Sequence, residues 1–549
     1  MVKRGRKQSS QAQPEEEQRT AKQIKQDVKP GGSGGDSSLF SSLPISELTH
    51  KAIREIFEYQ RMSPVQHETV APLLKGHDLL AKAKTGTGKT LAFLIPTIEK
   101  LCSAGRPHPL AIRAVVLSPS RELAMQIADE AEKLLTFHKL NVVVLVGGVK
   151  ITRDYKSLEK PADIVVATPG RLQDHLQNTP GFRERLSSVE TLVLDEGDQL
   201  LDQGFRAEID RIIQQLPKNR QSLCFSATVP DSLGAVLSVA LRPDFKTINC
   251  VGEEDTDTHA RIDQAYAIVD MSQHTLGLYS IIKKEMSENP TDYKVICFLP
   301  TARQTQFFAE ALNFAGVKAL EIHSRKSQSN RTRVSDEFRA ASCGVLLSSD
   351  VSARGVDYPD VSMVIQLGCP STREQYVHRL GRTGRAGKNG KGLLMLGPWE
   401  AGFQRQDLKD LPLDEATSTV HAAILEFGDE TSMARSVSRV NEDTRTQTYQ
   451  AWLGYYNSSL RRWKWNKDKL VAMGNQMSSE VLLLDEPPAL LAKTVGKMGL
   501  TGVAGLKVER GGGGGEDHQG RCGRGGEGAG KGEAVARAEA VVRKRRWQG

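Results

Sequence analysis

The segment AKTGTGKT, residues 83–90, has the composition of a loop that binds a polyphosphate. It stands between an apolar run and the helical pattern LAFLIPTIEK, so backbone N–H groups and the positive end of a helix can surround phosphate oxygens. We expect Lys89 to reach the β and γ phosphates and Thr90 to hold Mg²⁺. Gly86 and Gly88 leave room for the phosphates to approach the backbone. An incidental glycine turn is the alternative, which the strand and helix context disfavours.

A second set of chemically active residues lies in TLVLDEGDQLLD, where Asp195, Glu196 and Asp198 follow an apolar run. Acidic residues at the carboxyl end of a buried strand face the ligand crevice. Asp195 can orient Mg²⁺ there, while Glu196 positions and activates the water that attacks a γ-phosphate. Taken alone, these carboxylates are explained equally well by an acidic helix N-terminus. Lys89 and Thr90 on an earlier strand of the same domain favour the catalytic interpretation.

A third motif, HRLGRTGR, places arginines at a spacing of three residues: Arg379, Arg382 and Arg385. Guanidinium groups at that density repel one another unless an anion is supplied, and a nucleotide across a cleft would supply it. Arg382 and Arg385 are therefore candidates for groups that complete a phosphate site. A solvated basic loop is the alternative.

Short apolar runs between helical patterns are the elements that must position these motifs. Continuous apolar runs are typical of strands buried on both faces, with the helices as right-handed crossovers between parallel strands. The pattern restarts after the polar stretch 251–259, which predicts two doubly wound α/β domains joined by a hinge that permits ligand-gated closure. The runs lie at 79–81, 114–117, 142–146, 164–167, 192–194 and 223–225, and then at 295–299, 319–322, 345–347, 363–367 and 393–396.

Local amino-acid composition divides the chain of 549 residues into folded domains and polar end segments. No apolar run reaches the roughly 18 residues of a spanning helix, and the N-terminus lacks the apolar centre of a secretory signal, so we expect a soluble intracellular protein. The two ends are too polar to fold and are expected to be disordered basic arms. The expected segments are an arm at 1–38, an ATP-binding domain at 39–248, a linker at 249–262, a second domain at 263–420, a helical extension at 421–508 and a Gly/Arg-rich tail at 509–549.

The distribution of charge and the spacing of the cysteines indicate which kinds of partner and metal site to expect. The net charge of +8 divides into +3 in each of the segments 1–38, 440–508 and 509–549, which leaves −1 for the residues between. We therefore expect the core to hold an acidic partner by a few placed groups, and the basic extension and arms to keep that partner nearby. The seven cysteines form no CxxC pair, so we expect mostly small buried hydrophobes in a reducing compartment rather than a zinc site.

Over residues 39–430 the order of these motifs resembles that of the DEAD-box ATP-dependent RNA helicases. YQRMSPVQ, residues 59–66, resembles the family's Q motif, although Tyr59 and Met62 replace the usual phenylalanine and proline. DEGD, residues 195–198, occupies the position of the four residues after which the family is named, with Gly197 in place of alanine. The resemblance implies two RecA-like domains that bind ATP and Mg²⁺, with adenine read by Gln66, its ring stacked on Phe40, and the phosphates held by Ala83, Lys84, Thr85, Gly86, Thr87, Gly88, Lys89 and Thr90.

The same resemblance implies how the two domains communicate. Ser226 and Thr228 of the SAT segment would bond to DEGD and couple hydrolysis to strand separation, while His378 and Arg379 would couple the domains. Arg382 and Arg385 would reach the γ-phosphate, and Gly355 and Asp357 would contact the nucleotide. The residues implied to grip RNA are Pro119, Arg121, Gly147, Gly148, Thr168, Pro169, Gly170, Arg171, Gln328 and Arg331.

The helical extension contains aromatic and basic residues with two different patterns. Tyr449, Trp452 and Tyr456 fall at helical spacing and are expected in a core. In RRWKW, Arg461 and Arg462 alternate with tryptophans in a manner that suits RNA stacking and phosphate contact. LGYYN and VGKMGLTGVAGL resemble the extension of a group of general RNA chaperones with mitochondrial and plant members.

These implications predict an RNA-stimulated ATPase that unwinds short duplexes or remodels RNA–protein complexes, with little sequence preference. We expect the protein to be a monomer that binds RNA. Proteins of such complexes are candidate partners, and no membrane association is expected. An ATP-gated RNA clamp and a DNA helicase remain alternatives. The compartment stays open, because Glu15–Glu17 argue against an organellar transit peptide whereas similar proteins include organellar members.

Overall fold

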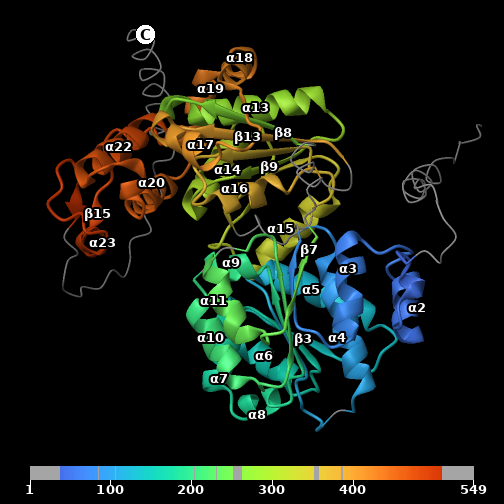
Figure 1. Ribbon diagram of the computed structural model, residues 1–549. Helices are drawn as coiled ribbons and strands as arrows, with labels where there is room; N and C mark the ends of the chain where they lie inside the picture. The colour runs from blue at the N-terminus through green and yellow to red at the C-terminus, as the bar shows by residue number, and fades with distance from the viewer. Residues whose placement is uncertain are drawn as a thin grey trace, which may run out of the picture.

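The computed structural model describes residues 37–83, 86–105, 107–202, 204–229, 231–250, 262–350, 358–384 and 388–509. Two α/β domains follow one another along the chain, and the last helices lie beside the second domain (Figure 1). Within the described residues, no helix combines the length and the apolar character needed to cross a bilayer. Lys84, Thr85, Gly355, Asp357 and Arg385, which carry sequence predictions, lie outside the described residues.

The first domain is built on a seven-stranded sheet in which every pair of neighbours is parallel. Two hydrophobic clusters cover its two faces, as continuous apolar runs require. The strands, in spatial order, are β3 Val142–Leu145, β4 Ile164–Ala167, β2 Ala114–Leu117, β5 Thr191–Asp195, β6 Gln221–Ser226, β1 Leu79–Lys82 and β7 Lys246–Asn249. The edge strand β7 was not among the predicted runs, because its sequence KTIN is mostly polar and exposed.

Serine side chains cap the start of three helices of the first domain, α2, α3 and α5. Ser63 and Gln66 form a reciprocal capping box at the start of α3, and Ser120 caps α5. Together with η1 Phe40–Ser42, the helices are α2 Glu47–Glu55, α3 Pro64–Leu74, α4 Lys89–Ser103, α5 Arg121–Leu134, α6 Ile151–Leu158, α7 Pro169–Asn178, α8 Phe182–Leu186, α9 Gly197–Asp202, α10 Arg206–Gln215 and α11 Asp231–Ala240.

The second domain repeats this plan with another parallel seven-stranded sheet. Its strands, in spatial order, are β10 Ala319–Ile322, β11 Gly344–Ser348, β9 Lys294–Phe298, β12 Met363–Leu367, β13 Gly390–Leu396, β8 Ile262–Ile268 and β14 Asp414–Glu415. Its helical elements are η3 Met271–Gln273, α13 His274–Glu288, α14 Ala302–Phe314, α15 Gln328–Ala340, α16 Arg373–Leu380, η5 Pro398–Glu400 and α17 Ala401–Asp407. The fold class predicted from the sequence, two doubly wound parallel sheets, is confirmed.

Two strands of the second sheet were not among the predicted runs. The sequence of β8, IDQAYAI, mixes polar and apolar residues, and only some of its positions are buried because it lies next to the edge. Strand β14 is two exposed residues at the edge itself. Continuous apolar runs identify central strands, whereas edge strands need no such pattern.

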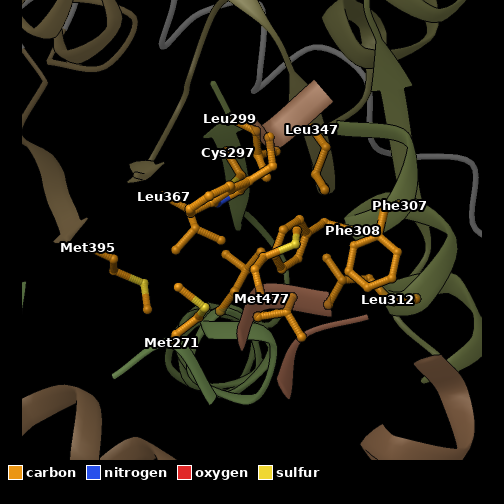
Figure 2. Close-up of a cluster of buried hydrophobic side chains, with 14 of the residues drawn as sticks. Met271, Cys297, Leu299, Phe307, Phe308, Leu312, Leu347, Leu367, Met395 and Met477 are labelled. Carbon is orange, nitrogen blue, oxygen red and sulfur yellow. The ribbon is translucent and has the colours of Figure 1, made fainter. Parts of the chain in front are cut away.

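The helical extension shares a core with the second domain. Its elements are α18 Thr417–Phe427, α19 Glu430–Arg439, α20 Glu442–Asn457, α21 Leu460–Trp463, α22 Lys467–Glu480, β15 Leu490–Leu491, α23 Ala492–Lys497 and β16 Val508–Glu509. Figure 2 shows Met477 of α22 beside Phe308 of α14 and Met271. Tyr449, Trp452 and Tyr456 are buried in the same cluster, as predicted. The extension is therefore built onto the second domain, and the expected boundary at 420/421 falls inside α18.

The cysteines follow the prediction in part. Cys224, Cys297 and Cys369 are buried, whereas Cys250 and Cys343 are half-buried and Cys102 is exposed. Within the described part of the chain all six are free thiols. Burial raises the pKa of the Cys224 and Cys297 thiols far above the usual range, so these two behave as small hydrophobes.

Candidate nucleotide site and nucleic-acid groove

The predicted phosphate loop lies between β1 and α4, at the carboxyl edge of the first sheet. The backbone N–H of Ala83 donates to the Ser226 carbonyl over 2.9 Å, which ties the start of the loop to β6. Gly86 and Gly88 have φ of 80° and 90°, in the left-handed region that favours glycine. Gly88 is the N-cap of α4, so the positive end of this helix faces the loop.

Lys89, which was predicted to reach the phosphates, is buried beside the carboxylates of the acidic motif. Its Nζ donates to Oε1 of Glu196 over 2.8 Å and to the Ala83 carbonyl over 3.3 Å. Burial alone would lower the pKa of Lys89, but Glu196 and Asp195 outweigh it and raise the pKa above the ordinary value. The ammonium therefore stays charged in the site.

Asp195 ends β5 and Glu196 begins the turn to α9, with φ of 51°. Both side chains are buried. Burial raises the pKa of Asp195 to about 7, against the opposing effect of Lys89, and its Oδ1 has no hydrogen-bond partner among the described residues. The second oxygen of Glu196 accepts from Gln199 Nε2 over 2.8 Å. A buried carboxylate oxygen left unpaired among other carboxylates fits a hard divalent cation such as Mg²⁺.

Asp198 is the point at which the SAT segment meets the acidic motif. Its backbone N–H donates to Ser226 Oγ over 3.0 Å. Thr228 donates to Oδ2 of Asp198 through its backbone N–H over 3.0 Å and through Oγ1 over 2.7 Å. The structure thus places both hydroxyls against the acidic segment.

Gly197 lies against β6, which explains why this position holds no larger residue. A Cβ at Gly197 would lie 2.9 Å from Cys224 Sγ and 3.4 Å from a methyl of Leu233. Gly197 is also the first residue of α9, where glycine costs less helix stability than it does in a helix interior.

The second domain contributes His378 to the same cluster. His378 Nε2 lies 3.7 Å from Oδ2 of Asp198 across the domain boundary, and both side chains are buried. Burial would raise the pKa of Asp198, but His378 and Thr228 outweigh it, so the pKa lies below its ordinary value. Oxygen and nitrogen atoms of Glu196, Asp198 and His378 lie within 4.8 Å of one another.

The predicted arginine groups have contacts within the second domain. Arg379 is buried, with Nε donating to Asp350 Oδ1 over 2.8 Å. Arg382 is also buried, and its Nε donates to the His378 carbonyl over 3.2 Å. The structure thus groups Arg382 with His378, and the phosphate contact of Arg382 remains a prediction.

The Q motif is joined directly to the phosphate loop. Gln66 Oε1 accepts from the Ser63 N–H over 2.8 Å, and Nε2 donates to the Gly88 carbonyl over 3.0 Å. Both ends of the Gln66 amide are therefore engaged inside the protein. Phe40 is 3% exposed and belongs to a hydrophobic core cluster of the first domain, so its predicted stacking on a base remains a prediction.

A groove of about 600 Å³ crosses the domain boundary away from the phosphate loop. Seven of the predicted RNA contacts line it: Pro119, Arg121, Gly147, Thr168, Gly170, Arg171 and Arg331. Among its other lining residues are Ser120, Glu122, Ser324, Asp350, Ser371 and Gln375, which were not predicted as contacts. Glu122 directly follows the predicted Arg121, and Gln375 lies three residues before HRLGRTGR, which is the signal that could have identified these two. Pro169 is instead buried as the first residue of α7.

Glycine lets Arg121, which lines this groove, approach the backbone of residues 147 and 148 closely. A Cβ at Gly148 would come within 2.0 Å of Arg121 Nη1, and one at Gly147 within 3.3 Å of Nη2. Opposite, Gln328 Nε2 donates to Glu122 Oε1 over 3.1 Å, and Arg331 forms an ion pair with the same carboxylate. Glu122 therefore joins the two domains beside the groove.

Arg462 has contacts that differ from its predicted role in RNA binding. Its Nη1 donates to the carbonyls of Ser371 over 2.6 Å and Pro370 over 3.3 Å, and its guanidinium lies 4.8 Å from the centre of the Phe403 ring. Nη1 of Arg462 therefore binds protein carbonyls, and a contact of Arg462 with RNA remains a prediction. Arg461, its neighbour on α21, is exposed.

Comparisons with known proteins agree with this arrangement. A family model described as DEAD/DEAH box helicase matches residues 63–236, and one described as helicase conserved C-terminal domain matches residues 277–387. The chain is 47% identical to DEAD-box ATP-dependent RNA helicase 26 of Oryza sativa subsp. japonica, with 87% of each chain covered. It is 46% identical to DEAD-box ATP-dependent RNA helicase 25 of Arabidopsis thaliana, covering 86% of this chain and 83% of the relative.

Among solved structures, Mss116p bound to single-stranded RNA and AMP-PNP matches with a TM-score of 0.74 and 28% identity. The match covers 88% of this chain and 99% of that one, so it extends beyond the two sheets. With the phosphate loop, the carboxylates and the interdomain groove in place, these similarities establish that the chain belongs to the DEAD-box ATP-dependent RNA helicases, enzymes that hydrolyse ATP in an RNA-dependent manner.

Proposed function

We propose that this helicase couples hydrolysis of ATP to local unwinding of RNA through one buried cluster, formed by Lys89, Asp195, Glu196, Asp198 and His378. The observation that carries the proposal is the 3.7 Å approach of His378 to Asp198, because it connects the nucleotide motifs of one domain to the arginine motif of the other. A group shared by both domains is needed if ligand binding is to drive closure.

Lys89 and Glu196 act in sequence in this proposal. Lys89 exchanges its contact with Glu196 for phosphate oxygens when ATP binds, since an ammonium at the start of α4 faces the loop. Release of Glu196 leaves it as the base that takes a proton from the attacking water. Gln199 holds the other oxygen of Glu196 and keeps the carboxylate oriented.

Asp195 and Thr90 are the residues proposed to hold Mg²⁺, which would supply positive charge to the phosphate oxygens. Arg382 and Arg385 are proposed to stabilise the γ-phosphate as the domains close, and Gln66 to link recognition of adenine to the loop through Gly88. The other residues of the phosphate loop are proposed to bind the phosphates, as the family resemblance implies. Gly355 and Asp357 are proposed to contact the nucleotide on the same ground.

The groove is proposed to hold the sugar-phosphate backbone of one RNA strand. Its lining offers the guanidinium groups of Arg121, Arg171 and Arg331, together with Gly147 in a turn and Gly170 in the first turn of α7, where the lack of a side chain leaves room for a strand. Such a surface reads phosphates and 2′-hydroxyls more than bases, so we propose binding that is largely independent of sequence.

Several finer points are proposed from resemblance alone. The DEGD form keeps all three carboxylates and is proposed to be active. The extension is proposed to serve as in the RNA-chaperone group, with Arg461 exposed toward RNA. We propose a monomer that can act on RNA–protein complexes. Its proposed compartment is the nucleus or cytoplasm, with a mitochondrion or plastid as the alternative that the family resemblance implies.

The test is ATP hydrolysis with RNA, with DNA of matched sequence and with neither, beside displacement of a short RNA duplex. We expect RNA to stimulate hydrolysis and DNA to fail. Lys89→Ala and Glu196→Gln are expected to abolish both activities while leaving the fold intact by circular dichroism. Wild-type hydrolysis by both variants would contradict the site. Intact hydrolysis without displacement would favour the ATP-gated clamp instead.

A further inference from the structure

One wall of the groove is segment 369–375, which runs from the connection after β12 into the first turn of α16. Ser371 and Gln375 of this segment line the groove. They are linked to each other, since the Ser371 N–H and Oγ donate to Gln375 Oε1 over 2.6 Å and 3.0 Å. The position of this wall therefore depends on what holds the backbone from Cys369 to Ser371.

The helical extension holds three consecutive carbonyls of this backbone. Tyr455 Oη donates to the Cys369 carbonyl over 2.5 Å. Arg462 Nη1 donates to the Pro370 carbonyl over 3.3 Å and to the Ser371 carbonyl over 2.6 Å. Backbone acceptors outside a sheet need partners, and here α20 and α21 provide them.

A buried carboxylate fixes the same segment from its other side. Glu400 Oε1 accepts from the Cys369 N–H over 2.9 Å and from Tyr456 Oη over 2.6 Å. The other oxygen, Oε2, accepts from the Gly397 N–H over 3.0 Å. Both the N–H and the carbonyl of Cys369 are thus connected to neighbouring tyrosines of α20, so the extension and the wall form one unit.

Arg462 is itself held in a fixed orientation. Its guanidinium lies 4.8 Å from the centre of the Phe403 ring and 5.2 Å from that of Trp463, and Nη2 lies 3.5 Å from Asp407 Oδ2. A planar guanidinium restrained on several sides loses little further entropy on binding two carbonyls. Lysine has no such planar fork and cannot reproduce these contacts.

We propose that Tyr455 and Arg462 are positioning residues for RNA, which hold segment 369–371 so that Ser371 and Gln375 face the RNA strand. The inference rests on the proposed RNA groove and adds to it: the extension contributes to RNA affinity through the wall of the second domain. A positioning role differs from phosphate contact in one measurable way, since loss of a phosphate contact reduces the dependence of binding on salt.

The experiment measures binding of a fluorescent single-stranded RNA to the full chain with an ATP analogue, from 50 to 200 mM salt. The variants are Tyr455→Phe, Arg462→Ala and Arg462→Lys, with Arg461→Ala as the matched loss of one charge on the same helix. We expect Tyr455→Phe and Arg462→Ala each to weaken binding about 5–10-fold with the salt slope of wild type, an effect the size of one lost hydrogen bond. Arg462→Lys is expected to bind as weakly as Arg462→Ala.

The double variant Tyr455→Phe/Arg462→Ala is expected to lose less affinity than the product of the single losses, because both changes release the same segment. Three results would overturn the proposal: wild-type affinity in Tyr455→Phe, full rescue by Arg462→Lys, or a salt slope reduced by about 0.7 in Arg462→Ala. Tyr455→Phe removes one oxygen and keeps the ring, so it remains decisive if an arginine variant unfolds. Failure of wild type to bind RNA would instead contradict the groove itself.

Discussion

Lys89 and Glu196 form a buried ion pair, with 2.8 Å between Nζ and Oε1. The group proposed to neutralise phosphate charge is therefore bound to the group proposed to activate water. The pair satisfies two charges that would be costly to bury separately. It also means that binding of ATP and release of the base are linked, because Lys89 cannot serve both partners fully.

Glu196→Gln separates these two roles. We expect kcat for ATP hydrolysis to fall at least about 100-fold, since an amide cannot accept the proton of the attacking water. ATP affinity should stay equal to that of wild type or increase, because Lys89 no longer has an anionic partner to leave. Stopped-flow binding of a fluorescent ATP analogue and single-turnover hydrolysis measure the two quantities. Weaker nucleotide binding together with normal hydrolysis would contradict the prediction.

Gly197 and Cys224 are expected to be coupled in stability. Gly197→Ala alone should lower the free energy of unfolding by about 1–2 kcal/mol, because its Cβ would lie 2.9 Å from Cys224 Sγ. In a Cys224→Ala background the same change should cost little, since the sulfur is gone. Thermal melts of wild type, the two single variants and the double variant measure this coupling as a double-mutant cycle. Equal costs in both backgrounds would show that the contact does not restrict this position.

Glu58 has φ of 54°, which is unfavourable for a residue with a side chain. It lies just beyond α2, where the Tyr59 N–H donates to the Ile53 carbonyl. We expect Glu58→Gly to raise the free energy of unfolding by up to about 1 kcal/mol, because glycine adopts this conformation without strain. Glu58→Ala is the control, since alanine keeps the strain. A melting temperature that responds equally to both changes would assign the effect to the lost charge.

His274 is expected to make the second domain sensitive to acid. Burial lowers its pKa from 6.5 to about 4, although the carbonyl of Val269, 3.1 Å from Nε2, and Asp270 partly oppose the shift. The folded state therefore prefers neutral imidazole, whereas the unfolded state takes up a proton below about pH 6.5. Stability should be unaffected above pH 6.5 and fall by up to about 3 kcal/mol as the pH approaches 4.

His274→Gln tests this pH dependence, because glutamine can donate to the Val269 carbonyl and does not titrate. Denaturant melts between pH 4 and 7 should show a shallower loss of stability in the variant than in wild type. Parallel curves for the two proteins would exclude His274 as the titrating group.

The central strands and the phosphate loop were predictable from the sequence because their signals are local. Continuous apolar runs identify strands buried on both faces, and Gly86, Gly88 and Lys89 carry their conformational and chemical requirements in their residue types. The edge strands β7 and β14 carry no such pattern, since few of their side chains are buried. Their pairing depends on the neighbouring strand.

By itself, the sequence determined the fold class, the order of motifs and the family to which they belong, because these depend on periodicity and on residues close together in the chain. The partners of those residues depend on how distant parts of the chain pack together. Arg461 and Arg462 are alike in type and adjacent in sequence, yet one is exposed and the other binds the Pro370 and Ser371 carbonyls. Contacts made over about 90 residues depend on how α21 packs against the second domain, and no local pattern records that packing.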